Sequence, residues 1–179
     1  MTTVRLRPEG PADITAVRQV VTEAFARPDA PVPAEVGLVE ALRASEAWIP
    51  ELSMVAEVGG EIVGYALLSR VRVDPGILPA LALGPVAVRP DRQGLGYGTA
   101  VVQAVLDAAA ELGERLVVVL GNPTFYRRFG FEPAARFALT SPWSGLGDPW
   151  QALVLPAAVS GAEPPPSGDV SFPHAWAQV

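Results

Sequence analysis

The sequence contains no cysteine and only one histidine. It therefore cannot build a disulfide framework, a thiolate nucleophile, a cysteine zinc site or a multi-histidine metal cluster. The opening segment MTTVRLRPEGPAD has no apolar core of signal-peptide length, and the most apolar stretch, LPALALGPVAV, is too short and too interrupted to span a bilayer. These absences predict a cytoplasmic protein with no metal cofactor and no membrane partner.

Basic residues are few compared with acidic ones, 13 against 19, which gives a formal net charge of −6 and a sequence pI near 4.8. Such a chain is poorly suited to coating nucleic acid or an anionic membrane, so we expect no nucleic-acid partner and a local site for any anionic ligand. The 179 residues, 50% of them apolar, suffice for one globular core. The composition does not decide between a monomer and a homodimer.

The spacing of apolar residues predicts a mixture of strands and helices. Strand patterns occupy residues 3–8, two stretches around Gly59-Gly60 within 52–74, and residues 80–88, 115–120, 135–139 and 151–156. Helical patterns occupy residues 10–25, 33–45, 96–112 and 122–131. No internal repeat is present.

The composition changes after Thr140, where tryptophan, glycine and proline become frequent. We expect residues 1–156 to form the main domain. We expect residues 157–179 to form a proline-rich tail that is irregular or covers this domain as a flap, because a triple proline cannot lie inside a helix or a central strand. Trp143, Trp150 and Trp176 are expected to anchor this tail, and a tail over a cleft would also form an acceptor pocket.

The segment VAVRPDRQGLGYGT, residues 86–99, leads from an apolar strand past two arginines into three closely spaced glycines. Glycine permits positive φ and lets another molecule approach the main chain closely. The unpaired amides at the start of the following helix carry partial positive charge, so this loop suits a phosphate. A turn used only for tight packing is the alternative. The P-loop and dinucleotide-binding spacings are not met, because no lysine follows the last glycine and Thr99 replaces the third one.

The strand before this loop contains Gly84 and Pro85. Proline has no N–H to give a sheet ladder and glycine is common at bulges, so the strand should bend and part from a neighbour. The main chain of residues 86–88 would then be free to pair with an extended ligand that carries amides. Coenzyme A has this form, with pantetheine amides followed by a pyrophosphate.

These residues resemble the GNAT superfamily of acetyl-CoA-dependent N-acetyltransferases. The family signature is Gln or Arg, two residues, Gly, one residue, then Gly or Ala, and Gln93, Gly96 and Gly98 match it after the usual valine and proline at Val88 and Pro90. The segment GNPTFYRRFGF resembles the family's late tyrosine-bearing helix. The C-terminal ALVLP and FPHAW are similar to a bacterial branch whose substrates are largely unassigned.

The resemblance implies an α/β (α+β) fold: a mixed, strongly twisted sheet flanked by helices and splayed between strands 80–88 and 115–120, with acetyl-CoA in the opening. It implies transfer of an acetyl group to a primary amine of a small molecule, a peptide or a protein. The cofactor-binding residues that it indicates are Val86, Ala87, Val88, Arg92, Gln93, Gly94, Leu95, Gly96, Tyr97, Gly98, Thr99 and Asn122.

Some of these positions have a second interpretation. Asn122 precedes Pro123, and we prefer its interpretation as the N-cap of a helix, since the family's asparagine often lies farther ahead of the tyrosine. Arg127 and Arg128 either meet the 3′-phosphate of CoA or face solvent.

The catalytic residue that the resemblance indicates is Tyr126, as the acid that protonates the leaving thiolate. A phenol with a pKa near 10 is protonated at neutral pH and can donate to a thiolate whose conjugate acid has a pKa near 8.5. On a helix Phe125 and Phe129 share one face, while Tyr126 is turned about 100° away from it. A packing role for this tyrosine is the alternative.

No general base can be assigned from the sequence. Strand 80–88 carries no carboxylate, and the nearest ones along the chain, Glu57, Glu61 and Asp74, are typical of solvated surface positions. A chain of water molecules would serve instead. The competing function is a catalytically weak acyl-CoA-binding or interaction module that has the fold without a base.

Overall fold

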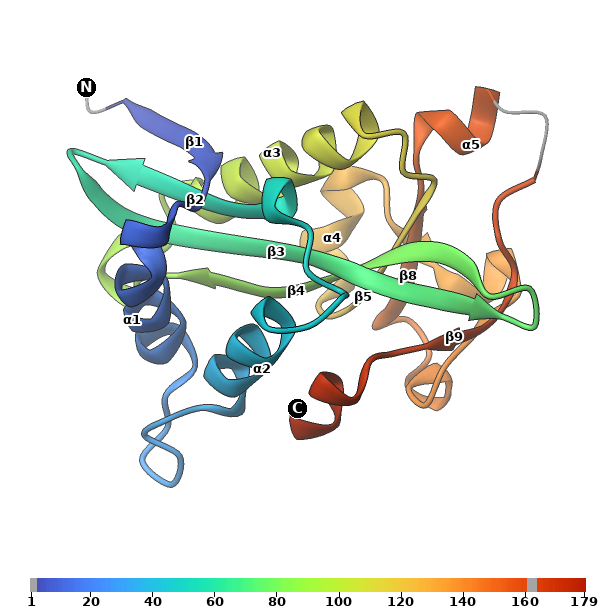
Figure 1. The fold of residues 1–179 in the computed structure, drawn as a ribbon, viewed down its shortest axis with the longest axis horizontal. Helices are drawn as coiled ribbons and strands as arrows, with labels where there is room; N and C mark the ends of the chain where they lie inside the picture. The colour runs from blue at the N-terminus through green and yellow to red at the C-terminus, as the bar shows by residue number, and fades with distance from the viewer. Residues whose placement is uncertain (1–2, 161–163) are drawn as a thin grey trace.

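One mixed sheet runs through the molecule and carries helices on both faces (Figure 1). The computed structural model describes residues 3–160 and 164–179. The longer strands are β1 (Val4–Pro8), β2 (Ser53–Val58), β3 (Glu61–Asp74), β4 (Leu78–Val88), β5 (Leu116–Leu120) and β8 (Trp150–Val154). Their spatial order is β1-β2-β3-β4-β5-β8, and every neighbouring pair is antiparallel except the parallel pair β4 and β5. This architecture confirms the predicted fold class.

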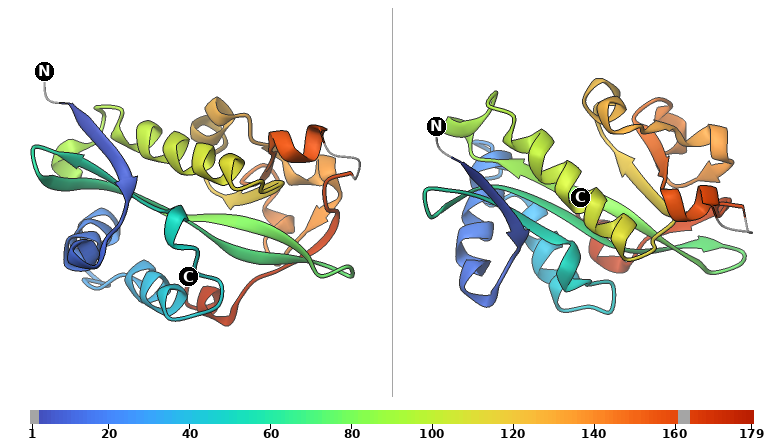
Figure 2. Two further views of the ribbon diagram at one scale, coloured as in Figure 1. Left: turned by 45° about the horizontal axis from the view of Figure 1, so that its top comes forward. Right: turned by 90° about the horizontal axis from the view of Figure 1, so that it is seen from above.

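The helices divide between the two faces of the sheet (Figure 2). Helices α1 (Ile14–Phe25) and α2 (Ala34–Arg43) cover one face, and α3 (Tyr97–Glu111) covers the other. In α3 the fully buried residues Val101, Val105 and Ala109 recur every four positions, so one stripe of the helix packs on the sheet. The short helix α4 (Pro123–Tyr126) continues into the 3-10 turn η4 (Arg127–Phe129).

The predicted strand over residues 135–139 is wrong. Residues Ala134–Phe137 form the 3-10 turn η5, and Ala138 takes a left-handed conformation with φ 53°. The tight turn ends this run before it can pair, so only Leu139–Thr140 is extended, as the short strand β7. Another short strand, β6 (Glu132–Pro133), pairs with the edge of β8.

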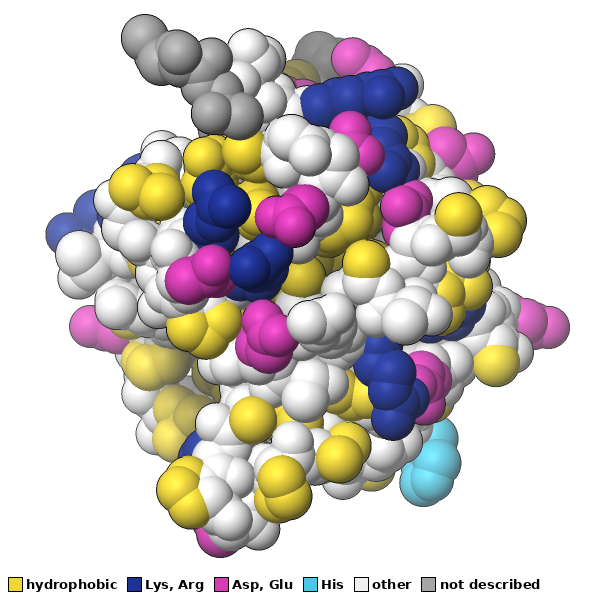
Figure 3. Space-filling model, turned by 90° about the vertical axis from the view of Figure 1, so that its left-hand side faces the viewer, with side chains coloured by type: hydrophobic (Ala, Val, Ile, Leu, Met, Phe, Trp, Pro, Cys, Tyr) yellow, Lys and Arg dark blue, Asp and Glu magenta, His cyan; other side chains and the backbone are white. Residues whose placement is uncertain are grey.

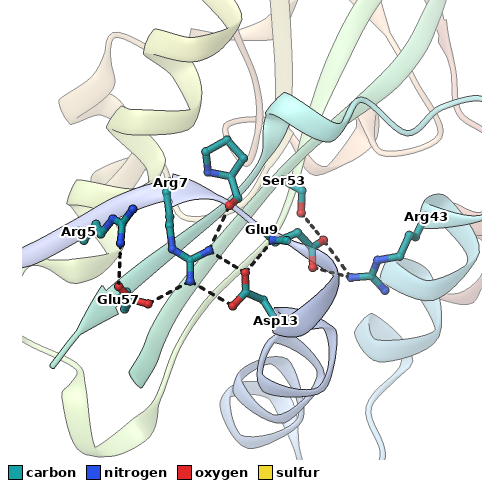
Figure 4. Close-up of polar contacts among 9 residues, drawn as sticks. Arg5, Arg7, Glu9, Asp13, Arg43, Ser53 and Glu57 are labelled. Carbon is teal, nitrogen blue, oxygen red and sulfur yellow. Dashed lines mark hydrogen bonds and ion pairs between the residues drawn. The ribbon is translucent and has the colours of Figure 1, made fainter. Parts of the chain in front are cut away.

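Polar contacts fix β1 to the first two helices (Figure 4). Arg7 donates hydrogen bonds to Asp13 Oδ2 at 2.7 Å and to Glu57 Oε1 at 3.0 Å, which joins β1 to the start of α1 and to β2. This hydrogen bond from Arg7 lowers the pKa of Asp13 below its ordinary value. Arg43, at the end of α2, donates to Glu9 Oε1 at 3.0 Å, and the Glu9 side chain is only 5% exposed. The positions of α1 and α2 are thereby set by charge pairs as well as by apolar packing.

The C-terminal segment, predicted to be irregular or a covering flap, adds a strand to the sheet. Strand β9 (Gly168–Ser171) pairs with the far end of β3 and with β7. The 3-10 turn η7 (His174–Gln178) then packs against α2, so closely that a Cβ on Gly37 would lie 2.6 Å from Gln178 Oε1. Residues 161–163 of the predicted tail lie outside the described residues.

Candidate active site

Strands β4 and β5 part from each other in the middle of the sheet. Ala66 of β3 lies opposite Val86 while Leu68 lies opposite Leu83, so Gly84 and Pro85 face a single residue of β3 and form a bulge. The parallel pairing of β4 with β5 ends at Leu83, and within the described chain no strand pairs with residues 84–88 on that side. The bulge predicted from the sequence is therefore present, and it leaves one edge of the β4 main chain open.

The loop after β4 presents backbone amides at the start of α3. Gly94 and Gly96 have φ of 77° and 87°, a left-handed conformation that favours glycine, and Gly96 is the N-cap of α3. The first helical hydrogen bond runs from the Ala100 N–H to the Gly96 carbonyl at 3.0 Å. The amides of the first turn therefore have no helical partner, which is the arrangement that binds anions at helix N-termini.

This loop borders a cavity of about 440 Å³, which we call the loop cavity. A Cβ added at Gly94 or Gly96 would meet no protein atom within 4 Å, so the space in front of the loop is open. The predicted cofactor residues that line it are Val86, Val88, Arg92, Gln93, Gly94, Gly96, Tyr97, Gly98 and Thr99.

Three predicted cofactor residues lie elsewhere. The side chain of Ala87 is buried on the opposite face of β4, with α1 and α2, and the residue is paired with Tyr65 of β3. Leu95 points outward and is 62% exposed. Asn122 accepts a hydrogen bond from the Thr124 N–H at 2.9 Å as the N-cap of α4, and it does not line the loop cavity.

Two arginines supply positive charge to the loop cavity. Arg128 donates a hydrogen bond to Thr99 Oγ1 at 2.9 Å, and its guanidinium lies 4.7 Å from the centre of the Phe125 ring. Arg92 is 3.9 Å from Glu61 and lines the cavity from the loop side. Elsewhere on the face shown in Figure 3, basic side chains alternate with acidic ones and form no broad basic patch.

A second cavity of about 340 Å³, the splay cavity, opens where β4 and β5 separate. Its floor is formed by the main chain and side chains of the two strands, including Val86, which also lines the loop cavity. Trp143, Trp150, Phe172 and Trp176 form an aromatic wall, with Trp143 and Phe172 edge to face at 4.7 Å between ring centroids. The tryptophans expected to anchor the tail therefore also line the cavity.

Tyr126 reaches the splay cavity from α4. Its ring packs edge to face on Phe125 and Phe131, with centroid separations of 4.9 and 5.7 Å, and against Gly121, where a Cβ would come within 2.5 Å of Cε2. Burial raises the pKa of Tyr126 to about 12. The phenol therefore stays protonated throughout the neutral range, at a fixed position beside the opening.

The carboxylates considered from the sequence lie outside the splay cavity. Glu57 is paired with Arg7, Glu61 lies 3.5 Å from Arg89, and neither these two nor Asp74 lines the cavity. The carboxylate that does line it is Glu35 on α2, which the sequence reasoning missed.

A signal for Glu35 was present in the sequence. Val39 and Leu42 follow it at i+4 and i+7, the spacing of the buried stripe of α2, so Glu35 lies on the helix face that turns toward the sheet. A charged residue on an otherwise apolar stripe is the pattern that should have indicated it.

Neither a metal centre nor a membrane span is found in the part of the chain that the structure describes. Residues 3–160 and 164–179 contain no group of three or more histidine, aspartate or glutamate side chains placed to hold a metal ion. None of their helices combines the length and apolarity needed to cross a bilayer.

Known proteins share this pattern over most of the chain. The model of the Acetyltransferase (GNAT) family matches residues 17–131. The uncharacterized N-acetyltransferase YhbS of Escherichia coli (strain K12) is 33% identical over 147 residues, which are 82% of this chain and 84% of YhbS. The uncharacterized N-acetyltransferase YjhQ of the same strain is 34% identical over 69% of this chain and 67% of its own length.

Two solved structures match nearly the whole chain. A GNAT family acetyltransferase from Brucella melitensis in complex with acetyl-CoA has a TM-score of 0.75 and 32% identity, and the match covers 97% of this chain and 98% of that one. Escherichia coli YhbS in complex with CoA has a TM-score of 0.84 and 28% identity, covering 99% of this chain and 93% of that one.

Proposed function

Because the chain belongs to the acetyltransferase (GNAT) family and is therefore an acyltransferase, we propose that it transfers the acetyl group of acetyl-CoA directly to a primary amine. One observation carries the proposal: the loop cavity and the splay cavity adjoin at Val86. The first is suited to a pyrophosphate and the second to an acyl group and its acceptor. The acetyl-CoA and CoA complexes of the relatives support acetyl-CoA as the donor.

The residues of the loop fit the two ends of the donor. In the proposed complex the unpaired amides of residues 93–99 bind the pyrophosphate, with Arg92 and Arg128 adding positive charge beside it. The open edge of β4 over residues 86–88 pairs with the pantetheine amides as a further strand would. Gln93 supports this geometry, since its side-chain amide donates to the Val88 carbonyl at 3.2 Å and ties the loop to the strand.

The chain's own contribution to the chemistry is to position the reactants and stabilise charge. Acetyl-CoA supplies an acetyl group activated as a thioester. A neutral amine nitrogen forms the amide bond to the acetyl carbon, the carbon–sulfur bond breaks, the amine proton leaves to water, and water protonates the departing sulfur. Tyr126, with a pKa of about 12, is about 3.5 units less acidic than a thiol near 8.5. We therefore assign to it a hydrogen bond to the departing sulfur and not a complete proton transfer.

The C-terminal residues belong to the same proposal. We propose that residues 1–156 form the acetyltransferase domain and that 157–179 complete its acceptor side, since Phe172 and Trp176 line the splay cavity.

The test is acetyl-CoA turnover with a panel of amines, read as CoA release by a thiol reagent. The chain contains no cysteine, so the thiol signal comes from CoA alone. It also contains no lysine, so acetyl-lysine found in a peptide or protein acceptor cannot come from the enzyme. Release of CoA together with an N-acetylated amine supports the proposal. Tight CoA binding without turnover for any amine would instead support an acyl-CoA-binding module.

A further inference from the structure

The splay cavity differs from the loop cavity in its charge. Among its lining side chains within the described residues, Glu35 is the single charged one, and no arginine or histidine reaches it. Within the described chain Glu35 also has no ion-pair or hydrogen-bond partner, whereas Glu40 on the same helix is paired with Arg18. The cavity therefore holds a carboxylate whose partner is not supplied by the surrounding protein.

The rest of the cavity is apolar and wide. The aromatic wall of Trp143, Trp150, Phe172 and Trp176 faces the aliphatic side chains of β4 and β5. The volume of about 340 Å³ lies within the range of small-molecule sites.

From this arrangement we infer that the acceptor is a small apolar monoamine, an amine on an aromatic or branched aliphatic body, and that Glu35 determines this specificity by binding its ammonium group. The bound ammonium gives one proton to water before the neutral nitrogen attacks the acetyl carbon. The inference rests on the proposed function and narrows its substrate class. The Glu35 carboxylate pairs with the single positive charge of the acceptor, and the aromatic wall packs against the acceptor's apolar body.

The same lining excludes other amines. A carboxylate or phosphate next to the amine would be buried without a cationic partner, which is strongly unfavourable. A second ammonium group, as in a polyamine, would leave one charge unpaired against aromatic side chains. Amino acids and polyamines are therefore poor acceptors.

The position of Glu35 is set by contacts on both sides of α2. Arg43, two turns further along the helix, is held by the buried carboxylate of Glu9, and Gly37 lets the helix lie directly against η7. These contacts hold α2, which carries Glu35, against η7, which carries Trp176 of the aromatic wall.

The first experiment compares 2-phenylethylamine with L-phenylalanine, which differ by one carboxylate, and includes spermidine and a lysine-containing peptide. With saturating acetyl-CoA, kcat/KM for 2-phenylethylamine should exceed that for L-phenylalanine by about 100-fold or more. Equal or better turnover of L-phenylalanine, spermidine or the peptide overturns the inference and leaves the proposed function intact. Failure of every amine to release CoA overturns both.

The second experiment replaces Glu35. Glu35→Gln keeps the shape and removes the charge, so KM for 2-phenylethylamine should rise about 10- to 100-fold, with a smaller change in kcat and no change in KM for acetyl-CoA. Glu40→Gln is the matched control on the same helix, because its side chain is half-exposed and outside the cavity, and its kinetics should equal those of the wild type. An unchanged amine KM in Glu35→Gln overturns the assignment of this residue.

Discussion

Replacing Gly98 by alanine tests the loop without disturbing the fold. Gly98 lies in the first turn of α3, and its backbone is not in the left-handed region. An added Cβ would lie 3.4 Å from Val88 Cγ2 and 3.8 Å from Phe125 Cζ, which are ordinary van der Waals contacts. Gly96 is a poorer choice, since with φ 87° any side chain there strains the backbone whether or not a ligand binds.

Gly98→Ala is expected to stabilise the folded protein and to weaken CoA binding. Alanine in place of glycine in a helix stabilises the folded protein by about 0.5 to 1 kcal/mol, because the unfolded chain loses freedom. The same methyl group occupies the floor of the loop cavity and keeps a phosphate away from the helix amides. Loss of two charge-assisted hydrogen bonds at about 1.5 kcal/mol each weakens CoA binding by about 3 kcal/mol, or about 100-fold.

Calorimetric titration with CoA and thermal unfolding of the free protein measure these effects separately. Gly145→Ala is the control, because Gly145 has open space around its Cβ position, has no left-handed backbone and lies outside the loop cavity. Gly98→Ala with unaltered Tm and unaltered CoA affinity would refute the assignment of this loop to the pyrophosphate. A large fall in Tm would mean that Gly98 is required for packing instead.

Three further substitutions test the tyrosine and the network at β1. Tyr126→Phe should lower kcat about 100-fold with little change in CoA affinity, because it removes a hydrogen bond to the charge that develops on the sulfur, and equal turnover in steady-state assays would make the residue a packing aromatic. Gly121→Ala should displace the Tyr126 ring, because a Cβ there lies 2.5 Å from it, and should reproduce part of that loss in kcat while CoA titration is unchanged. Asp13→Asn removes a carboxylate whose pKa is lowered in the folded protein by the hydrogen bond from Arg7. The ionised Asp13 carboxylate therefore stabilises the folded state above its unfolded pKa near 3.9, and this stabilisation is lost as pH falls through the folded pKa. Chemical denaturation should show about 1 to 2 kcal/mol less stability at pH 7 and a shallower acid limb, and an unchanged acid limb would count against the charge pair.

Local patterns predicted most of the elements correctly because each depends on residues close in sequence. The Gly59-Gly60 turn, with φ of 59° and 83°, joins β2 and β3 as expected for a hairpin. The bulge at Gly84 and Pro85 follows from the missing N–H and the missing side chain. The prediction for residues 135–139 was wrong because a 3-10 turn, and not a strand, packs their apolar side chains into the core. The residues packed around the segment decide between these two conformations.

Local sequence patterns could not predict which residues line the splay cavity. Glu35 and Tyr126 are 91 positions apart by their sequence numbers, and only the packing of α2 and α4 at opposite sides of the splay brings both to one cavity. The same holds for the C-terminal segment, whose prolines predicted an irregular tail. Pairing of β9 with β3 and burial of Val170 are long-range contacts that no local propensity records.

The sequence by itself determined the loop of unpaired amides before α3, since glycines before a helix produce exposed amides wherever that helix is placed. It also determined the break in the sheet, which a glycine and a proline impose locally. Tertiary structure alone decided which side chains line the splay cavity beside this break in the sheet. They are the aromatic wall from the C-terminal third of the chain and one carboxylate from α2. The physical reason is that backbone geometry is set by neighbouring residues, whereas the surroundings of a charge depend on which distant surfaces pack around it.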